Sequence, residues 1–137
     1  MTKLKCFYVS LFFLLLGIQQ SYSQVYRFKT SGFSVLEKNE KGKWGKWSDL
    51  SLVNIVVTLD TDKNRFLIYS QNIQLYEILT YQPESESESD LVYSFTCRDN
   101  DGIDCTVSII TRKKQENRKQ LYITYSDHVI VYNIFTM

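Results

Sequence analysis

Apolar and polar residues alternate along most of the chain after Gln24, and this period of two is the strongest constraint on its fold. The clearest case is Leu91–Cys97, where Leu, Tyr, Phe and Cys alternate with Val, Ser and Thr. The same alternation returns in Cys105–Thr111 and in Leu121–Ser126. Successive side chains of a strand point to opposite faces, so the pattern predicts strands with one buried face. No segment shows a sustained helical period with helix caps, and we therefore predict an all-β protein.

The strands are expected to be short and to follow one another without a long crossover. They are predicted over Val25–Lys29, Phe33–Glu37, Trp44–Ser48, Leu52–Leu59, Arg65–Ser70, Ile73–Tyr81, Leu91–Cys97, Cys105–Thr111, Leu121–Ser126 and Val129–Phe135. Strands at this spacing, joined by turn-like connectors, favour an antiparallel up-and-down (meander) β-barrel of about 8–10 strands. A two-sheet β-sandwich is the alternative.

A meander also predicts which connectors share an end of the barrel, because alternate connectors lie together. One end would carry Thr30–Gly32, Asp49–Ser51, Gln71–Asn72, Arg98–Asp104 and Asp127–His128. The other would carry most of the long polar loops, namely Lys38–Lys43, Asp60–Asn64, Gln82–Asp90 and Arg112–Gln120. Loops held by a rigid scaffold often bind ligands or partners, which favours the second end.

The first 23 residues have the layout of a secretory signal peptide. Lys3 and Lys5 precede an apolar stretch, Phe7–Ile18, and small residues follow at Ser21 and Ser23. That stretch would span roughly 18 Å as a helix, against roughly 30 Å for a membrane core, so we expect no membrane anchor. Removing 23 of the 137 residues leaves 114, enough for a single domain over residues 24–137. We expect the protein to be secreted or periplasmic.

The charge balance of the mature chain argues against several partners. Without Lys3 and Lys5, 14 basic residues face 15 acidic ones, a net charge of about −1. Such a chain has no overall electrostatic attraction to nucleic acid or to an anionic membrane. We expect a monomer or weak dimer whose partner is a protein or a small ligand.

Two cysteines remain after cleavage, Cys97 and Cys105, on the apolar faces of neighbouring predicted strands. An even count in an exported chain predicts a disulfide, and the two side chains could meet across one hairpin. A reactive thiol pair or half of a metal site are the alternatives. The spacing is not that of a C-x-x-C redox motif, and no further mature cysteine completes a zinc site.

The segment Trp44-Gly45-Lys46-Trp47 is the most suggestive binding feature. On a regular strand the two indoles point to opposite faces, so one would enter the core and the other would be exposed or line a mouth. A bulge at Gly45 could bring both to one side, and packing of both in the core is the simpler alternative. An exposed indole can stack on a sugar or a flat ligand, with Tyr122, Tyr132, Tyr69 and Tyr76 as possible neighbours.

Three polar segments have simple interpretations. Pro83–Asp90, with four carboxylates, is expected to be a mobile solvated loop, and Arg112–Lys119, with five basic residues, a charged hairpin tip that lies near it. Arg98–Asp104 resembles part of a calcium loop. Alignment on Gly102, however, places Cys97 and Ser108 where an EF-hand needs carboxylates, so we predict a tight turn and no metal site.

Catalytic motifs are lacking in the sequence. His128, the single histidine, lies beside Asp127 in a predicted turn, and no G-x-S-x-G, H-E-x-x-H or phosphate-binding glycine loop is present. We predict a protein that is not an enzyme and carries no cofactor. The alternative is a small secreted hydrolase, acting on glycan or ester substrates through Asp127 and His128 or through a carboxylate pair.

Strand spacing and the early Trp44–Trp47 segment resemble the calycin-type class of small secreted β-barrels, which includes lipocalins and streptavidin. The lipocalin glycine-x-tryptophan pattern near the first strand is missing. The chain is also similar to small exported bacterial proteins with a short-spaced cysteine pair. The calycin resemblance implies a barrel that either holds one small ligand or is filled by its own side chains.

Together these patterns predict a non-catalytic exported binding protein. It would recognise a partner protein or a small apolar or glycan ligand through its surface or barrel mouth. Large apolar residues indicate a filled interior, which favours an outer surface or a loop end: Phe28, Phe33, Phe66, Phe95 and Phe135.

Overall fold

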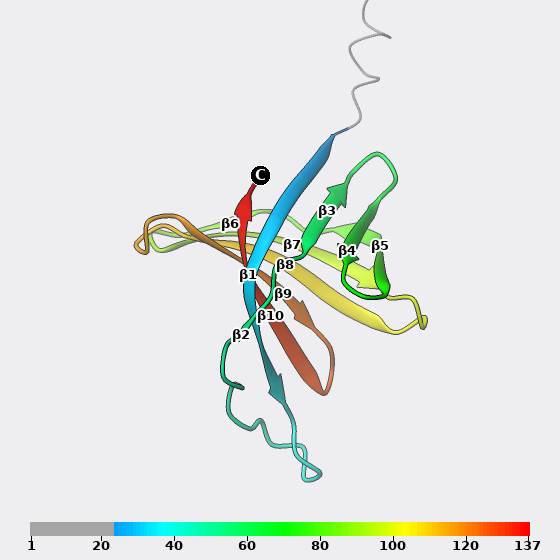
Figure 1. Ribbon diagram of the computed structural model, residues 1–137, viewed down its shortest axis with the longest axis vertical. Coiled ribbons are helices and arrows are strands. Elements are labelled where there is room, and N and C mark those ends of the chain that lie inside the picture. Colours follow the sequence, from blue (N-terminus) through cyan, green and yellow to red (C-terminus); the bar gives the residue numbers. More distant parts are fainter. Residues whose placement is uncertain (1–23) are drawn as a thin grey trace, which may run out of the picture.

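The structure is a computed structural model that describes residues 24–137, and in this range it contains strands and no helix. The predicted signal peptide lies outside the described residues. The strands are β1 (Val25–Glu37), β2 (Ser51–Leu52), β3 (Val56–Asp60), β4 (Arg65–Tyr69), β5 (Ile73–Tyr81), β6 (Ser85–Glu86), β7 (Asp90–Arg98), β8 (Asp104–Arg112), β9 (Arg118–Thr124) and β10 (His128–Thr136). Figure 1 shows their arrangement in space.

The sheet closes on itself, which confirms the predicted up-and-down barrel. Each barrel strand pairs antiparallel with the next along the chain, through β1, β3, β4, β5, β7, β8, β9 and β10, and β10 returns to pair with β1. The barrel therefore has eight strands, and the two-residue strands β2 and β6 add short pairings to β1 and β7. Closure leaves the barrel no free sheet edge.

The prediction of two strands over residues 25–37 was wrong, because β1 is a single strand with a bulge at its centre. The register with β10 shifts between Thr30 and Gly32, which leaves Ser31 as the extra residue. Gly32 suits this place because β2 comes close: an added Cβ would lie 3.0 Å from the carbonyl oxygen of Ser51. The Ser-Gly pair, typical of a turn, here bends a strand.

The predicted strand over residues 44–48 is also absent, and only an isolated bridge joins Lys38 to Trp44. The segment nevertheless runs beside the second half of β1. The Gly45 N–H donates to the Glu37 carbonyl at 2.8 Å and the Ser48 N–H to the Val35 carbonyl at 2.8 Å. The Val35 N–H in turn donates to the Ser48 hydroxyl at 2.8 Å. A side-chain oxygen thus takes the place of a ladder carbonyl, and the pairing stays irregular.

Because of these two differences, residues 38–43 lie at the opposite end of the barrel from the one predicted. Residues 38–43 share an end with the connector after β9, where the Lys38 N–H donates to the Asp127 carbonyl at 2.9 Å. We call this the long-loop end; it carries residues 38–55, 70–72, 99–103 and 125–127. The opposite end, the terminus end, carries Gln24, Met137 and residues 61–64, 82–89 and 113–117. In Figure 1 the connector after β1 extends from the bottom, away from the C-terminus.

Inward-facing side chains fill the middle of the barrel. The largest that are almost fully buried are Phe66, Ile68, Leu121, Ile123, Val57 and Val107. Phe66 and Phe95 meet edge to face, with ring centroids 5.1 Å apart. Of the predicted core phenylalanines Phe28 is also buried and Phe33 packs against the core, but Phe135 is 49% exposed, because β10 turns it outward.

A hydrogen-bonded group of side chains occupies the interior towards the long-loop end. The buried Tyr76 hydroxyl donates to Gln74 Oε1 at 2.8 Å, and the Tyr125 hydroxyl donates to Asp99 Oδ2 at 2.7 Å. Burial raises the pKa of Tyr76 and of Tyr125, so both hydroxyls stay neutral. The Tyr125 ring also stacks on His128, with centroids 4.4 Å apart. These contacts hold the connectors of this end against the barrel.

Cys97 and Cys105 are direct register partners on β7 and β8 and face the core. Both are free thiols in this structure, so it contains no disulfide at the predicted place. Burial is the main reason that the pKa of Cys97 is raised to about 12 and that of Cys105 to about 11. In this reduced state the pair is therefore poorly nucleophilic.

Candidate functional site

A cavity of about 480 Å³ opens at the terminus end of the barrel. Its lining comes from β1, β3, β5, β7, β8, β9 and β10 and from the turn after β3. The lining residues are Tyr26, Phe28, Leu59, Thr61, Tyr81, Leu91, Tyr93, Phe95, Ile109, Thr111, Lys119 and Thr136. We call this cavity the mouth. It is the open end of the same interior whose middle is filled.

Strand alternation places most of these side chains. Phe95 lies in the inward row of β7, and Leu91 and Tyr93 continue this row towards the terminus end. Tyr26 extends the row of Phe28 on β1 in the same way. Strand ends rise above the packed middle of a barrel, so their inward side chains line a hollow instead of a core.

Tyr81 reaches the mouth through a bulge in β5. The register with β7 shifts between Ile78 and Thr80, so that Tyr81 lies opposite Phe95. Without the shift, strict alternation would turn Tyr81 away from the interior. The two rings meet edge to face, with centroids 5.5 Å apart. Leu79, the extra residue, is 42% exposed.

Three tyrosines are half-exposed around the mouth, Tyr26, Tyr81 and Tyr93, at 45%, 46% and 41%. The Tyr26 hydroxyl donates to Gln24 Oε1 at 2.7 Å, and the Tyr81 hydroxyl donates to Asn64 Oδ1 at 2.6 Å. Partial burial, with the nearby Cys97 and Asp60, raises the pKa of Tyr81, which keeps its ring neutral. The mouth thus presents neutral aromatic surface to solvent.

Among residues 24–137, Lys119 is the one charged residue that lines the mouth. It lies two residues before Leu121 and four before Ile123, so all three side chains are on the inward face of β9. Its ammonium donates to the buried Thr111 hydroxyl at 3.0 Å. A positive charge therefore stands beside an otherwise uncharged lining.

The four ligand-binding residues predicted from the sequence do not form one site. Tyr132 is buried in the core beside Phe33, with ring centroids 5.9 Å apart. Trp47 and Tyr122 meet edge to face on the outside of the barrel, with centroids 6.4 Å apart. Trp44 lies under the Lys38 ammonium, which is 4.8 Å from its ring centroid. None of the four lines the mouth.

Neither tryptophan enters the core. Trp44 is 46% exposed and Trp47 is 45% exposed, so the expectation that at least one indole packs inside was wrong. The reason is the irregular segment described above, whose backbone bonds to the edge of β1 outside the barrel ladder. The exposed Trp47 and the partly buried Tyr122 form the second surface with binding character, and we call them the outer aromatic pair.

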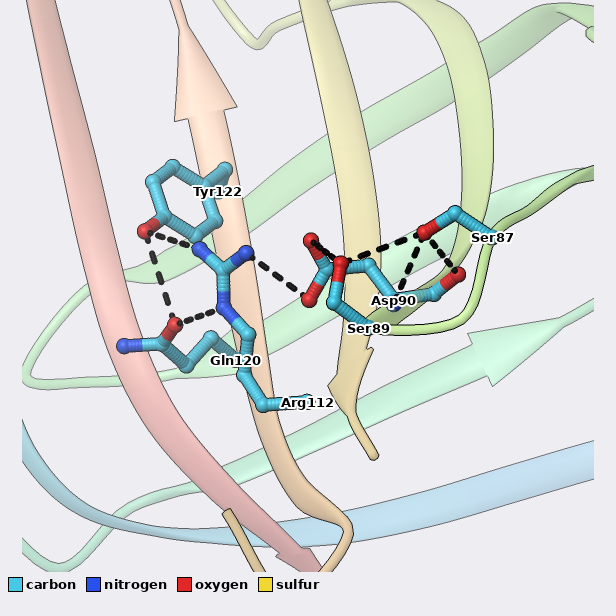
Figure 2. A network of polar contacts seen from close by, with 6 residues as sticks. All are labelled: Ser87, Ser89, Asp90, Arg112, Gln120 and Tyr122. Carbon is cyan, nitrogen blue, oxygen red and sulfur yellow. Dashed lines mark hydrogen bonds and ion pairs between the residues drawn. The ribbon is translucent and has the colours of Figure 1, made fainter. Parts of the chain in front are cut away.

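A polar network joins the acidic and basic segments beside the mouth (Figure 2). The Arg112 guanidinium lies 3.1 Å from Asp90 Oδ1 and donates to Gln120 Oε1 and to the Tyr122 hydroxyl, each at 3.1 Å. The Ser87 N–H donates to the Asp90 carbonyl at 2.8 Å. Figure 2 shows how these contacts bridge β8, β9 and the start of β7.

The acidic segment is thus more ordered than predicted. Its residues Ser85 and Glu86 form β6, and the Lys113 ammonium pairs with the Glu86 carboxylate. The predicted attraction between the two charged segments is confirmed by this ion pair and by that of Arg112 with Asp90. Backbone pairing and these contacts together replace the mobile loop that composition alone suggests.

The turn over residues 99–103 has the predicted tight geometry. Asp99 Oδ1 accepts from the N–H groups of Asp101 and Ile103 at 3.0 and 2.9 Å, and Gly102 has φ of 76°. Burial alone would raise the pKa of Asp99, but the hydrogen bonds from Ile103, Tyr125 and Asp101 outweigh it and lower that pKa. Within residues 24–137 no three His, Cys, Asp or Glu side chains are grouped to hold a metal.

The Asp127–His128 pair lies at the long-loop end, opposite the mouth. Asp127 Oδ1 and His128 Nδ1 are 2.7 Å apart. For residues 24–137, no hydroxyl of a serine or threonine lies within hydrogen-bond distance of this imidazole. The pair and the mouth therefore cannot act on the same bound molecule.

Comparisons with models of known protein families, with curated proteins and with solved structures gave no match. Among the described residues no helix is long and apolar enough to cross a membrane. The residues that line the mouth therefore carry the functional argument by themselves. Sequence reasoning missed Tyr26, Tyr81 and Lys119 as site residues. The one available signal was the alternation that sets Tyr93 on the face of Phe95.

Proposed function

We propose that this protein is a non-catalytic binding protein whose mouth takes one small, mainly apolar ligand. The observation that carries the proposal is an open aromatic cavity above a filled core. Small-molecule sites in proteins typically measure about 300–1,000 Å³ and are lined mainly by apolar side chains. The mouth, at about 480 Å³, has that size and that lining.

The chemistry of the lining favours an apolar ligand over a glycan. Eight of its twelve residues are aliphatic or aromatic. A buried sugar hydroxyl needs a hydrogen-bond partner, and an unpaired one costs roughly 1–3 kcal/mol. The hydroxyls of Tyr26 and Tyr81 already donate to Gln24 and Asn64, so what these residues offer a ligand is mainly ring surface.

We also propose that the protein is exported from the cytoplasm, because a signal peptide is predicted over its first 23 residues. An oxidising compartment would also favour a disulfide between Cys97 and Cys105, which are register partners that face the same core. The bond would pin the hairpin of β7 and β8, which supplies five of the twelve residues that line the mouth.

A neutral fluorescent probe, phenylnaphthylamine, tests the mouth directly because its emission rises when it enters an apolar site. Tyr93→Ala is expected to weaken its binding about tenfold, since the ring would lose its aromatic contact and part of its buried area. Tyr69→Ala is the matched control: Tyr69 is 43% exposed and does not line the mouth. Equal binding by both variants and the parent protein would refute the proposal.

The outer aromatic pair supports a second candidate, recognition of a partner protein. Trp47 and Tyr122 meet outside the barrel, Trp47 is 45% exposed, and Trp and Tyr are enriched at the centres of protein interfaces. Trp47→Ala would then abolish capture of a partner while leaving probe binding unchanged. If Trp47→Ala still captures the partner, the outer aromatic pair is not a binding surface.

A further inference from the structure

Lys119 is not needed to complete the apolar lining of the mouth. Its neighbours in the inward row of β9 are Leu121 and Ile123, both fully buried, and an aliphatic residue would continue that row. Instead the row ends in an ammonium at the rim of an aromatic cavity. Desolvating a lysine costs free energy, so its presence beside this lining points to a role for the charge.

The Lys119 ammonium has a neutral partner and no acidic one. It donates to the Thr111 hydroxyl at 3.0 Å, and in residues 24–137 no carboxylate oxygen lies within 4.0 Å of it. Asp60, the last residue of β3, uses Oδ1 to accept from the N–H groups of Asp62 and Lys63 in the turn that follows. The charge is therefore uncompensated by this part of the chain.

We propose that the ligand of the mouth is an apolar molecule with one acidic group, such as a carboxylate, that pairs with Lys119. This inference rests on the proposed function and adds the class of ligand. The apolar body would lie against Tyr26, Tyr81 and Tyr93, and the acidic group would meet the Lys119 ammonium beside Thr111. Surrounding apolar walls lower the local dielectric constant, which strengthens the attraction between the two charges.

Two dyes of the same ring skeleton separate the charge from the apolar contact. Phenylnaphthylamine is neutral, and anilinonaphthalene sulfonate is the same molecule with one sulfonate. Each is titrated by fluorescence against the protein and against Lys119→Met, Lys119→Arg and Lys29→Met. Lys29 is an exposed lysine of β1 that does not line the mouth, so its substitution removes the same charge elsewhere.

We expect the sulfonate dye to bind more tightly than the neutral dye. Lys119→Met should weaken binding of the sulfonate dye about tenfold, as loss of a charge-assisted hydrogen bond predicts, and should not weaken binding of the neutral dye. Lys119→Arg should retain the preference, and Lys29→Met should have little effect. Added salt should weaken only the sulfonate dye. Thermal unfolding of each variant verifies that it is folded.

Three results would overturn the inference, and they are distinguishable. If the two dyes bind with equal affinity and Lys119→Met changes neither, the ligand needs no acidic group and the inference is wrong. The proposed function still holds in that case if Tyr93→Ala weakens the binding of both dyes. Equal weakening of the sulfonate dye by Lys119→Met and Lys29→Met would indicate an effect of net charge alone. Failure of both dyes to bind would remove the proposed function and this inference together.

Discussion

Replacement of Thr30 by valine tests how the long connector after β1 is attached to the barrel. Thr30 is 2% exposed, and its Oγ1 accepts the Ile55 N–H at 3.0 Å. The same oxygen lies 3.2 Å from the carbonyl oxygens of Val53 and Ile55. Valine has nearly the same shape but no hydroxyl, so Thr30→Val removes the hydrogen bonds and creates no cavity.

The expected cost follows from the groups left behind. The Ile55 N–H would lose its acceptor, and the Val53 carbonyl would lose a donor, close to the barrel wall. An unsatisfied buried group costs roughly 1–3 kcal/mol, so we expect Thr30→Val to lower the free energy of unfolding by about 2 kcal/mol. For a domain of this size that corresponds to a fall in Tm of roughly 8 °C.

Urea unfolding, followed by tryptophan fluorescence, measures this change. Thr58→Val is the matched control, because Thr58 is 8% exposed and its hydroxyl has no hydrogen bond within residues 24–137. The free energy of unfolding of the control should stay within about 0.5 kcal/mol of that of the parent protein, and it should fall with urea at the same slope. If Thr30→Val costs no more than Thr58→Val, the hydroxyl does not hold the connector and the argument is wrong.

Three further predictions concern the cysteines, the acidic turn and the exposed indole. Protein recovered from an oxidising compartment should resist alkylation of Cys97 and Cys105 after denaturation, and its reduction should lower stability by roughly 2–3 kcal/mol; full alkylation without a reductant would contradict the bond. Asp99 has a lowered pKa in the folded state, so its stabilising contribution is present above the unfolded pKa of about 4 and is lost as pH falls through the folded value. Asp99→Asn should therefore flatten the loss of stability between about pH 5 and pH 3, measured by urea unfolding, and an unchanged profile would rule out this contribution. Trp47→Ala should cost about 1 kcal/mol or less, against roughly 3–5 kcal/mol for a core aromatic, because the indole packs on the outside; a core-sized loss in thermal unfolding would show that the indole is structural.

Local alternation was enough to predict the barrel strands β4, β5, β7, β8, β9 and β10, but not the short strand β6. Leu91–Cys97 and Cys105–Thr111 show unbroken alternation and form β7 and β8, with Cys97 opposite Cys105 as expected. In such hairpins the turn sets the register and each apolar residue must face the core, so neighbouring residues carry nearly all the information.

Prediction failed where distant chain segments decide the backbone. The residues Ser31 and Gly32 are typical of a turn, yet pairing with β10 holds them inside β1. Residues 44–48 alternate enough to predict a strand, yet the hydrogen bonds that Ser48 accepts from the Ser34 hydroxyl and the Val35 N–H keep them irregular outside the barrel. The partner of Ser31 and Gly32 lies about a hundred residues along the sequence, and the partner of residues 44–48 is a side chain, so the alternation of a segment shows neither.

The sequence by itself determined an all-β meander, the inward faces of most strands and the position of Cys97 opposite Cys105 on neighbouring strands. The tertiary structure decided where the barrel opens and which side chains line the opening. Tyr81 turns inward only because β5 shifts its register against β7, and Lys119 meets an aromatic cavity only because the sheet closes. The alternation of a strand sets only the face on which a side chain lies. Barrel closure brings the ends of seven strands together into one site.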